Sequence, residues 1–158
     1  MNSSFLRISR CSPDVARRGV SAVECAILAP LFTLLVLGTV DVGQFANVYQ
    51  KVSDASREGA RTAARFGTAT TAQVEAAVMD YLEAAAPDVP PSTLAAATDV
   101  TVSGAGGANI AGGSLTTLPS GTQIRVQVTV RYDPVRWING IGELSGSEIT
   151  ATTMMRRE

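Results

Sequence analysis

A long apolar run near the N-terminus is the feature that most constrains this chain. Residues 22–40 carry only one charged side chain, Glu24. As a helix rising about 1.5 Å per residue, the run reaches roughly 28 Å, close to the roughly 30 Å hydrocarbon core of a bilayer. A charge inside hydrocarbon costs about 2.5–3.5 kcal/mol even on lenient insertion scales. The run therefore predicts a transmembrane helix in which the cost of Glu24 must be offset.

Charge on either side of the run predicts its orientation. Four arginines and one aspartate precede Val20, whereas the first charge after the run is Asp41. The positive-inside rule then places the N-terminus in the cytoplasm and the bulk of the chain outside. The net charge is −1, and without residues 1–19, which carry +3, it would be −4. This balance does not indicate a nucleic-acid binder.

Two ordinary export routes fit the run poorly. It is longer than the roughly 7–15 residues of a signal-peptide core, and no small-x-small cleavage site closes it. A lipoprotein is also disfavoured, because Glu24 precedes Cys25 where lipid attachment requires small apolar residues. The run is therefore expected to stay in the mature protein.

The chemistry-bearing residues indicate that the chain is not an enzyme. There is no histidine, which excludes a Ser-His-Asp triad, a Cys-His pair and the usual histidine metal sites. Cys11 lies before the apolar run and Cys25 inside it, so neither can staple an exported domain. The glycine-rich segment 104–114 lacks the Gly-Lys-Ser/Thr ending of a phosphate loop and is expected to be a flexible hairpin connection. We expect no cofactor and no metal.

Helical spacing continues beyond the apolar run. Apolar and polar residues alternate at helical periodicity through residue 65, which predicts one helix from about 21 to 66, bent at Pro30, with a polar stalk as its second half. A second helix is predicted over residues 72–86, ended by Pro87. Its apolar face comprises Val74, Ala77, Val78, Tyr81 and Leu82.

After residue 91 the spacing of apolar residues changes from about 3.6 positions, typical of a helix, to every second position, typical of a strand. Polar and apolar side chains alternate at every position from 123 to 132, with the apolar ones at even positions. This pattern predicts a strand with one buried face. Weaker strand candidates lie at 99–103 and 148–155. We therefore predict an α+β fold with a small antiparallel sheet covered on one face by helix. Three further apolar residues are expected to cap this core, with a partner-binding patch as the alternative: Trp137, Ile138 and Ile141.

An arginine stripe follows the predicted stalk. Arg57, Arg61 and Arg65 recur every four residues and therefore share one helix face, with Glu58 one turn before Arg61. A solvated helix face explains such a pattern in most proteins. The alternative is a docking surface for a neighbouring subunit.

The segment that opens the apolar run resembles a known class. Gly19 is followed by VSAVE and then by the run, and this glycine-to-glutamate spacing is similar to that of type IV pilins, in which a prepilin peptidase cuts after the glycine. Within that class RRGVSAVECAILAPLFTLLVLGTVDVG resembles the TadE-like proteins of the tight-adherence (Flp) pilus system, with AVE and APL in matching places. The resemblance continues through REGARTAARF to the terminal ATTMMRRE. Cys25 departs from the aromatic residue frequent there.

The resemblance implies a non-catalytic minor pilin or pseudopilin that takes part in assembly of a tight-adherence pilus used in adhesion. It implies a basic leader at 1–19, a transmembrane helix at 20–40, a helical stalk at 41–66 and an exported α+β domain at 67–158. Cleavage between Gly19 and Val20 would create an amine four residues from Glu24, so the Glu24 carboxylate of one subunit could neutralise the amine of another. The alternative is that Glu24 rests at the headgroup boundary.

The implied partners are the prepilin peptidase, other pilins or TadE-like subunits bound through the N-terminal helix, the inner-membrane assembly platform and membrane lipid, but no nucleic acid. The implied location is the bacterial inner membrane, crossed once, with a cytoplasmic N-terminus and a periplasmic or extracellular C-terminal domain, or the pilus itself. Two alternatives stay open. One is an unprocessed signal-anchored periplasmic binding or scaffold module, and the other is a type II secretion pseudopilin.

Overall fold

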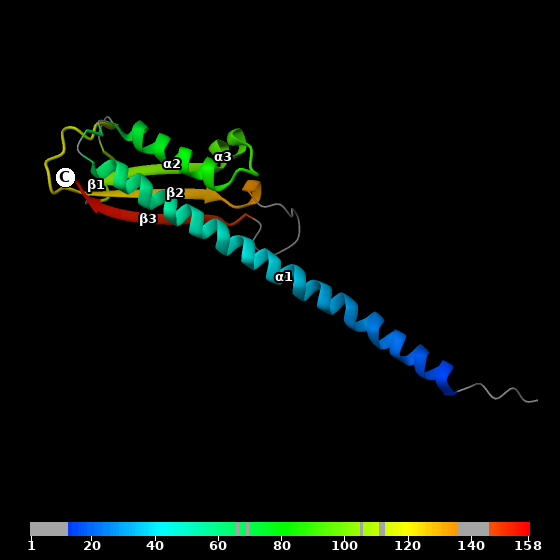
Figure 1. The fold of residues 1–158 in the computed structure, drawn as a ribbon. Coiled ribbons are helices and arrows are strands. Elements are labelled where there is room, and N and C mark those ends of the chain that lie inside the picture. Colours follow the sequence, from blue (N-terminus) through cyan, green and yellow to red (C-terminus); the bar gives the residue numbers. More distant parts are fainter. Residues whose placement is uncertain (1–12, 66, 69, 105, 111–112, 136–145) are drawn as a thin grey trace, which may run out of the picture. The chain divides into compact units, whose positions relative to one another are not determined.

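The computed structural model describes residues 13–65, 67–68, 70–104, 106–110, 113–135 and 146–158, with side chains from Ser21 onward. The chain divides into two units, residues 1–40 and 41–158. A long helix near the N-terminus, two further helices and a small antiparallel sheet follow one another along the chain (Figure 1). The predicted α+β fold class is confirmed.

Helix α1 is longer at its N-terminal end than the sequence pattern predicts. It spans Pro13–Ala64, whereas the predicted helix begins near residue 21 and ends near 66. Proline is well suited to the first turn of a helix because its missing N–H is unpaired there in any case. Pro30 lies inside α1, as expected. The helix contributes residues to both units.

In the second unit, α1 packs through small side chains. Its buried residues are Val52, Ala55, Ser56, Gly59, Ala60, Ala63 and Ala64. A Cβ atom added at Gly59 would lie 2.6 Å from Val78 Cγ2 and 3.1 Å from Val126 Cγ1. Glycine therefore lets α1 approach both the second helix and the sheet closely.

Two helices follow α1. Helix α2 spans Thr71–Ala85 and buries Val74, Val78 and Leu82, in agreement with the predicted helix. Helix α3, Pro91–Ala97, is absent from the sequence prediction, which has only Pro87 ending the second helix and then strands after residue 91. Pro91 is instead the first residue of α3, a position where proline is favourable, and Leu94 enters the core.

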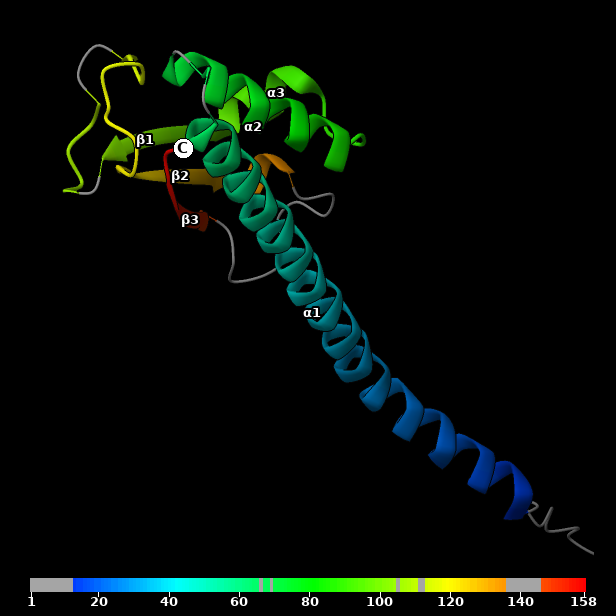
Figure 2. The same ribbon diagram turned by 60° about the vertical axis from the view of Figure 1, so that its left-hand side comes forward.

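The sheet has the order β1-β2-β3 and is antiparallel throughout. Strands β1 (Thr98–Gly104), β2 (Gln123–Arg131) and β3 (Glu148–Arg156) match the predicted segments to within one residue at each end. Val128 pairs with Val100 and Ala151. The even positions of β2 are buried against the helices and the odd positions are exposed or half-buried, which confirms the predicted faces. Figure 2 shows the sheet beside α2 and the end of α1.

Connections outside the regular elements also join the core. Leu115 follows the glycine-rich segment and is fully buried, although the sequence pattern did not identify it. Beyond β2, a 3-10 turn η2 spans Asp133–Val135. The Tyr132 ring meets Phe45 of α1 edge to face, with ring centroids 5.3 Å apart. The predicted cap of Trp137, Ile138 and Ile141 lies outside the described residues.

Candidate functional site

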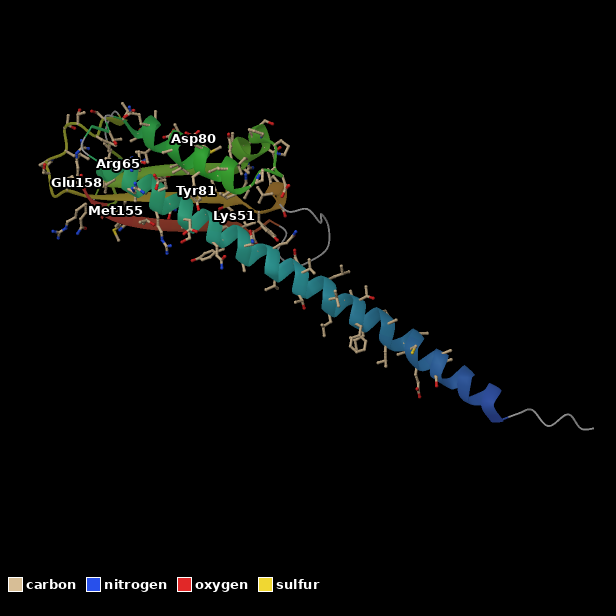
Figure 3. The ribbon with its side chains drawn as sticks, in the orientation of Figure 1. Lys51, Arg65, Asp80, Tyr81, Met155 and Glu158 are labelled. Atoms are coloured by element: carbon tan, nitrogen blue, oxygen red, sulfur yellow. The ribbon has the colours of Figure 1, made fainter. Side chains whose placement is uncertain are left out.

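The first unit presents an apolar helix surface that the described chain does not cover. The exposed fraction of the large apolar side chains from Val23 to Val36 ranges from 48% at Leu28 to 68% at Ile27. Within the described residues this is the one helix long and apolar enough to cross a membrane (Figure 3). Large apolar side chains left in water on every side of a helix are unfavourable. The segment is therefore suited to a single-pass membrane anchor.

The polar groups of this segment differ in how they are satisfied. The Thr33 and Thr39 hydroxyls donate to the Ala29 and Leu35 carbonyls at 2.8 Å, so the helix itself satisfies them. The Glu24 side chain is exposed, and no partner for its carboxylate occurs in the part of the chain that the structure describes. Gly19 and Val20 lie within α1. A carboxylate on an apolar helix surface thus needs a partner from another molecule or the headgroup region.

The arginine stripe, comprising Arg57, Arg61 and Arg65, lies on the exposed face of α1 in the second unit. Arg57 contacts Asp54 at 3.0 Å and Arg61 contacts Glu58 at 3.6 Å, yet the two arginine side chains stay 66% and 61% exposed. Arg65 is exposed as well. Exposed pairs of this kind contribute about 0.2–1 kcal/mol and exchange readily for other partners. The stripe is therefore accessible to a second protein.

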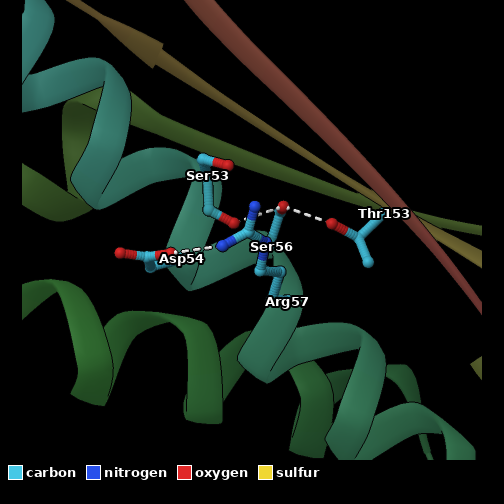
Figure 4. Close-up of polar contacts among 5 residues, drawn as sticks. All are labelled: Ser53, Asp54, Ser56, Arg57 and Thr153. Carbon is cyan, nitrogen blue, oxygen red and sulfur yellow. Dashed lines mark hydrogen bonds and ion pairs between the residues drawn. The ribbon is translucent and has the colours of Figure 1, made fainter.

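Ser56, the neighbour of Arg57 in the sequence, lies on the buried face of α1. The buried Ser56 hydroxyl lies 2.7 Å from the Thr153 hydroxyl of β3 and also reaches the Ser53 carbonyl at 2.8 Å. Figure 4 shows Ser56 directed toward Thr153, whereas the neighbouring Arg57 turns to Asp54. This contact joins the buried face of α1 to the edge strand β3, whereas Arg57 lies on the exposed face.

A cleft of about 710 Å³ opens in the second unit between α1, α2, α3 and the end of β2. Its lining is mostly apolar and includes Val48, Leu82 and Leu94. The amide nitrogen and oxygen of Gln44 are both buried beside the cleft, without a hydrogen-bond partner among the described residues. Because these two atoms are covered, the cleft offers mainly its apolar lining. The cleft is therefore suited to an apolar group.

The described residues place no group of three or more Cys, Asp or Glu side chains where it could hold a metal ion. In the cleft, Lys51 and Asp88 are the charged lining residues among those described. A nucleophile oriented by a base, which covalent catalysis requires, is not assembled there by the described side chains.

A family comparison bears on the apolar helix and the start of the packed segment. Residues 19–61 match the family model described as TadE-like protein. The chain carries a TadE-like segment. This match confirms, over residues 19–61, the resemblance to TadE-like proteins found in the sequence. The TadE-like segment includes Glu24 and two residues of the arginine stripe.

The match has a defined end. It stops at Arg61, so the extension of the resemblance to the C-terminal ATTMMRRE stays a prediction. Neither a curated protein nor a solved structure matches the chain.

Proposed function

We propose that this protein is a non-catalytic minor pilin or pseudopilin that takes part in assembly of a tight-adherence pilus. The observation that carries the proposal is the TadE-like match over residues 19–61, which contains the exposed apolar helix and Glu24. An apolar helix attached to a separately packed unit fits a subunit that is stored in the membrane and presents its second unit outside it.

The proposed organisation has four parts. Residues 1–19 form a leader that the prepilin peptidase removes, 20–40 cross the inner membrane, 41–66 form a stalk helix and 67–158 form the exported domain. In the structure, residues 41–64 belong to the same compact unit as the exported domain, so the stalk is partly a core helix. The N-terminus is cytoplasmic, and the partners are the peptidase, other pilins, the assembly platform and lipid.

Glu24 is assigned to assembly. Cleavage after Gly19 leaves a positive amine at Val20, and a Glu24 carboxylate from a parallel neighbour can neutralise it in the apolar phase. Desolvation offsets much of the attraction, so the pair acts mainly on register, but either charge left alone is costly.

Processing tests the first step. Gly19→Leu should leave a precursor that retains residues 1–19. The small glycine lets the backbone enter the peptidase at this position, and the bulkier leucine side chain should prevent this. Intact-mass analysis of membrane-extracted protein, from cells that hold the peptidase, should show a wild-type chain beginning at Val20. A wild-type chain beginning at Met1 would refute the pilin assignment.

Glu24 substitution tests the second step. Glu24→Val should still be processed and inserted, since it removes a charge from the membrane, but should fail to join the pilus. Glu24→Asp keeps the carboxylate and should retain most assembly. The measurements are crosslinking to other subunits and pilus counts on cells producing each processed variant. Normal piliation with Glu24→Val would reject the pairing and favour a headgroup position for Glu24.

A second candidate function is supported by the cleft. An apolar cleft in the second unit favours an unprocessed, signal-anchored binding or scaffold module. The same mass measurement separates the two, because the anchored module keeps Met1 and the pilin begins at Val20. A type II secretion pseudopilin would also begin at Val20 but would assemble with that system's subunits.

A further inference from the structure

Charge is separated along the second unit. Residues 66–124 contain five carboxylates and no lysine or arginine: Glu75, Asp80, Glu83, Asp88 and Asp99. By contrast, residues 51–65, at the end of α1 and one residue beyond it, carry four cations and two carboxylates, and the cations include the arginine stripe. One unit thus bears a negative surface and a positive surface on different helices.

The negative surface is concentrated on α2. Glu75, Asp80 and Glu83 are exposed; Asp80 and Glu83 lie opposite the buried Val74 and Leu82, and Glu75 lies at the edge of the buried face. No ion pair to any of the three carboxylates is present among the described residues. We call these three residues the acidic face of α2. Its charges are therefore not neutralised by the described residues of the same copy.

The acidic face and the arginine stripe have the same length in sequence. Arg57 and Arg65 are eight positions apart, as are Glu75 and Glu83. On a helix, eight positions correspond to about 12 Å along the axis and about 80° around it. The middle charges differ, because Asp80 follows Glu75 by five positions, about 140° around a helix, whereas Arg61 follows Arg57 by four, about 40°. Figure 3 labels Arg65, one residue beyond the end of α1, and Asp80 on α2. The two surfaces therefore match in length and are opposite in charge, without a one-to-one pairing of all three residues.

We propose that the arginine stripe of one copy docks against the acidic face of α2 of a second copy. Both faces are exposed in the same molecule, so a copy that uses its stripe still offers its acidic face to the next. Such a head-to-tail contact repeats instead of closing on itself in a pair, and it builds a ring or an open helical array. This inference rests on the proposed function, because parallel membrane helices would hold the copies side by side.

The contact is individually weak. Exposed pairs contribute about 0.2–1 kcal/mol each, so the contact selects the orientation of copies that are already concentrated in a membrane. Salt should weaken it, since the screening length falls from about 10 Å at 0.1 M to about 3 Å at 1 M.

Crosslinking of full-length copies in membranes tests the contact. In a Cys11→Ser, Cys25→Ser background, one tagged copy carries Glu58→Cys beside the stripe and a differently tagged copy carries Ala76→Cys within the acidic face. A short bismaleimide should join them, whereas Gln127→Cys on the outer sheet face, used in place of Ala76→Cys, should not react.

Charge reversal then gives the decisive comparison. Changing the three stripe arginines to Glu on the first copy should lower the crosslink yield about fivefold. Changing Glu75, Asp80 and Glu83 to Lys on the second copy should do the same, and the two reversed copies together should recover at least about half of the yield. All six side chains are exposed, and the urea midpoint of each variant verifies folding.

Three outcomes would overturn the proposal: no crosslink between copies, a crosslink insensitive to either reversal, or loss of yield without recovery in the double reversal. The last result would assign the stripe to another subunit or to anionic lipid. Two other results would refute the proposed pilus function and not the contact. These are an N-terminus at Met1 and unchanged pilus counts when the gene is deleted.

Discussion

The two halves of α1 show how side-chain size decides what a helix packs against. From Val23 to Val36 the helix carries Leu, Ile, Phe and Val on all sides, and these side chains are exposed. From Val52 to Ala64 one face carries mostly Ala, Ser and Gly, and that face is buried in the core of the second unit. The two halves belong to one continuous helix but to different units.

The difference lies in geometry as well as hydrophobicity. Small residues let the backbone of α1 come within van der Waals contact of Val78 and Val126, so the chain covers that half itself. Bulky residues distributed around the whole circumference leave no polar side to face water. The first half therefore requires lipid or other subunits, whereas the second half requires only the rest of the chain. Three changes test this contrast.

The largest effect is expected for Val128→Asp. Val128 is fully buried in the middle of β2, and an unpaired charge there should cost several kcal/mol, close to the total stability of a domain of this size. Thr129→Asp, on the outer face beside Thr150, should cost at most about 1 kcal/mol. Urea unfolding of the full chain in detergent, followed by circular dichroism, measures both. Equal destabilisation would contradict the assigned faces.

Truncating one leucine in each unit compares them directly. Leu82 is 3% exposed, and Leu82→Ala should destabilise the second unit by about 2–5 kcal/mol because it leaves a cavity. Leu31 is 62% exposed, so Leu31→Ala should leave the same urea midpoint unchanged. A shift of the midpoint by Leu31→Ala would show that the first half also stabilises the packed unit.

The smallest of the three effects is expected at Gly59. Gly59→Val forces side-chain atoms toward Val78 and Val126 and should cost about 1–3 kcal/mol through overpacking. Gly43→Ala is the matched control, since no atom lies within 4 Å of its added Cβ and alanine favours a helix. Thermal unfolding should therefore show a lower midpoint for Gly59→Val and an equal or higher one for Gly43→Ala. The reverse order would mean that α1 does not approach α2 closely.

Periodicity in the sequence predicted most of the fold because each pattern reports a local rule. The even-numbered apolar residues of 123–132 are buried, as alternation requires, and Val74, Val78 and Leu82 form the predicted buried face of α2. Helix α3 was missed because Pro91 can end one element or begin another, and only its context decides which. Leu115 was missed because it is a single apolar residue in a loop, without a period to identify it.

The candidate site divides in the same way. The spacing of Gly19 and Glu24 and the i, i+4 stripe are properties of neighbouring residues, so they were recognised from the sequence. The Ser56–Thr153 contact joins residues 97 positions apart, and the unpaired amide of Gln44 lies in a cleft built from three helices and a strand. The spacing of neighbouring residues cannot predict contacts of this kind.

The sequence by itself determined that a membrane-length apolar helix precedes an α+β unit, and that Glu24 follows a glycine at the spacing of the pilin class. Hydrophobic length and period are local properties, and they are expressed whatever the rest of the chain does. Only the tertiary structure decided that the second half of α1 is a core helix, how closely Gly59 brings it to α2, and that the arginines and the acidic face of α2 both remain outside. Those outcomes depend on which distant side chains fill the space beside each residue, and close packing is set by the whole unit at once.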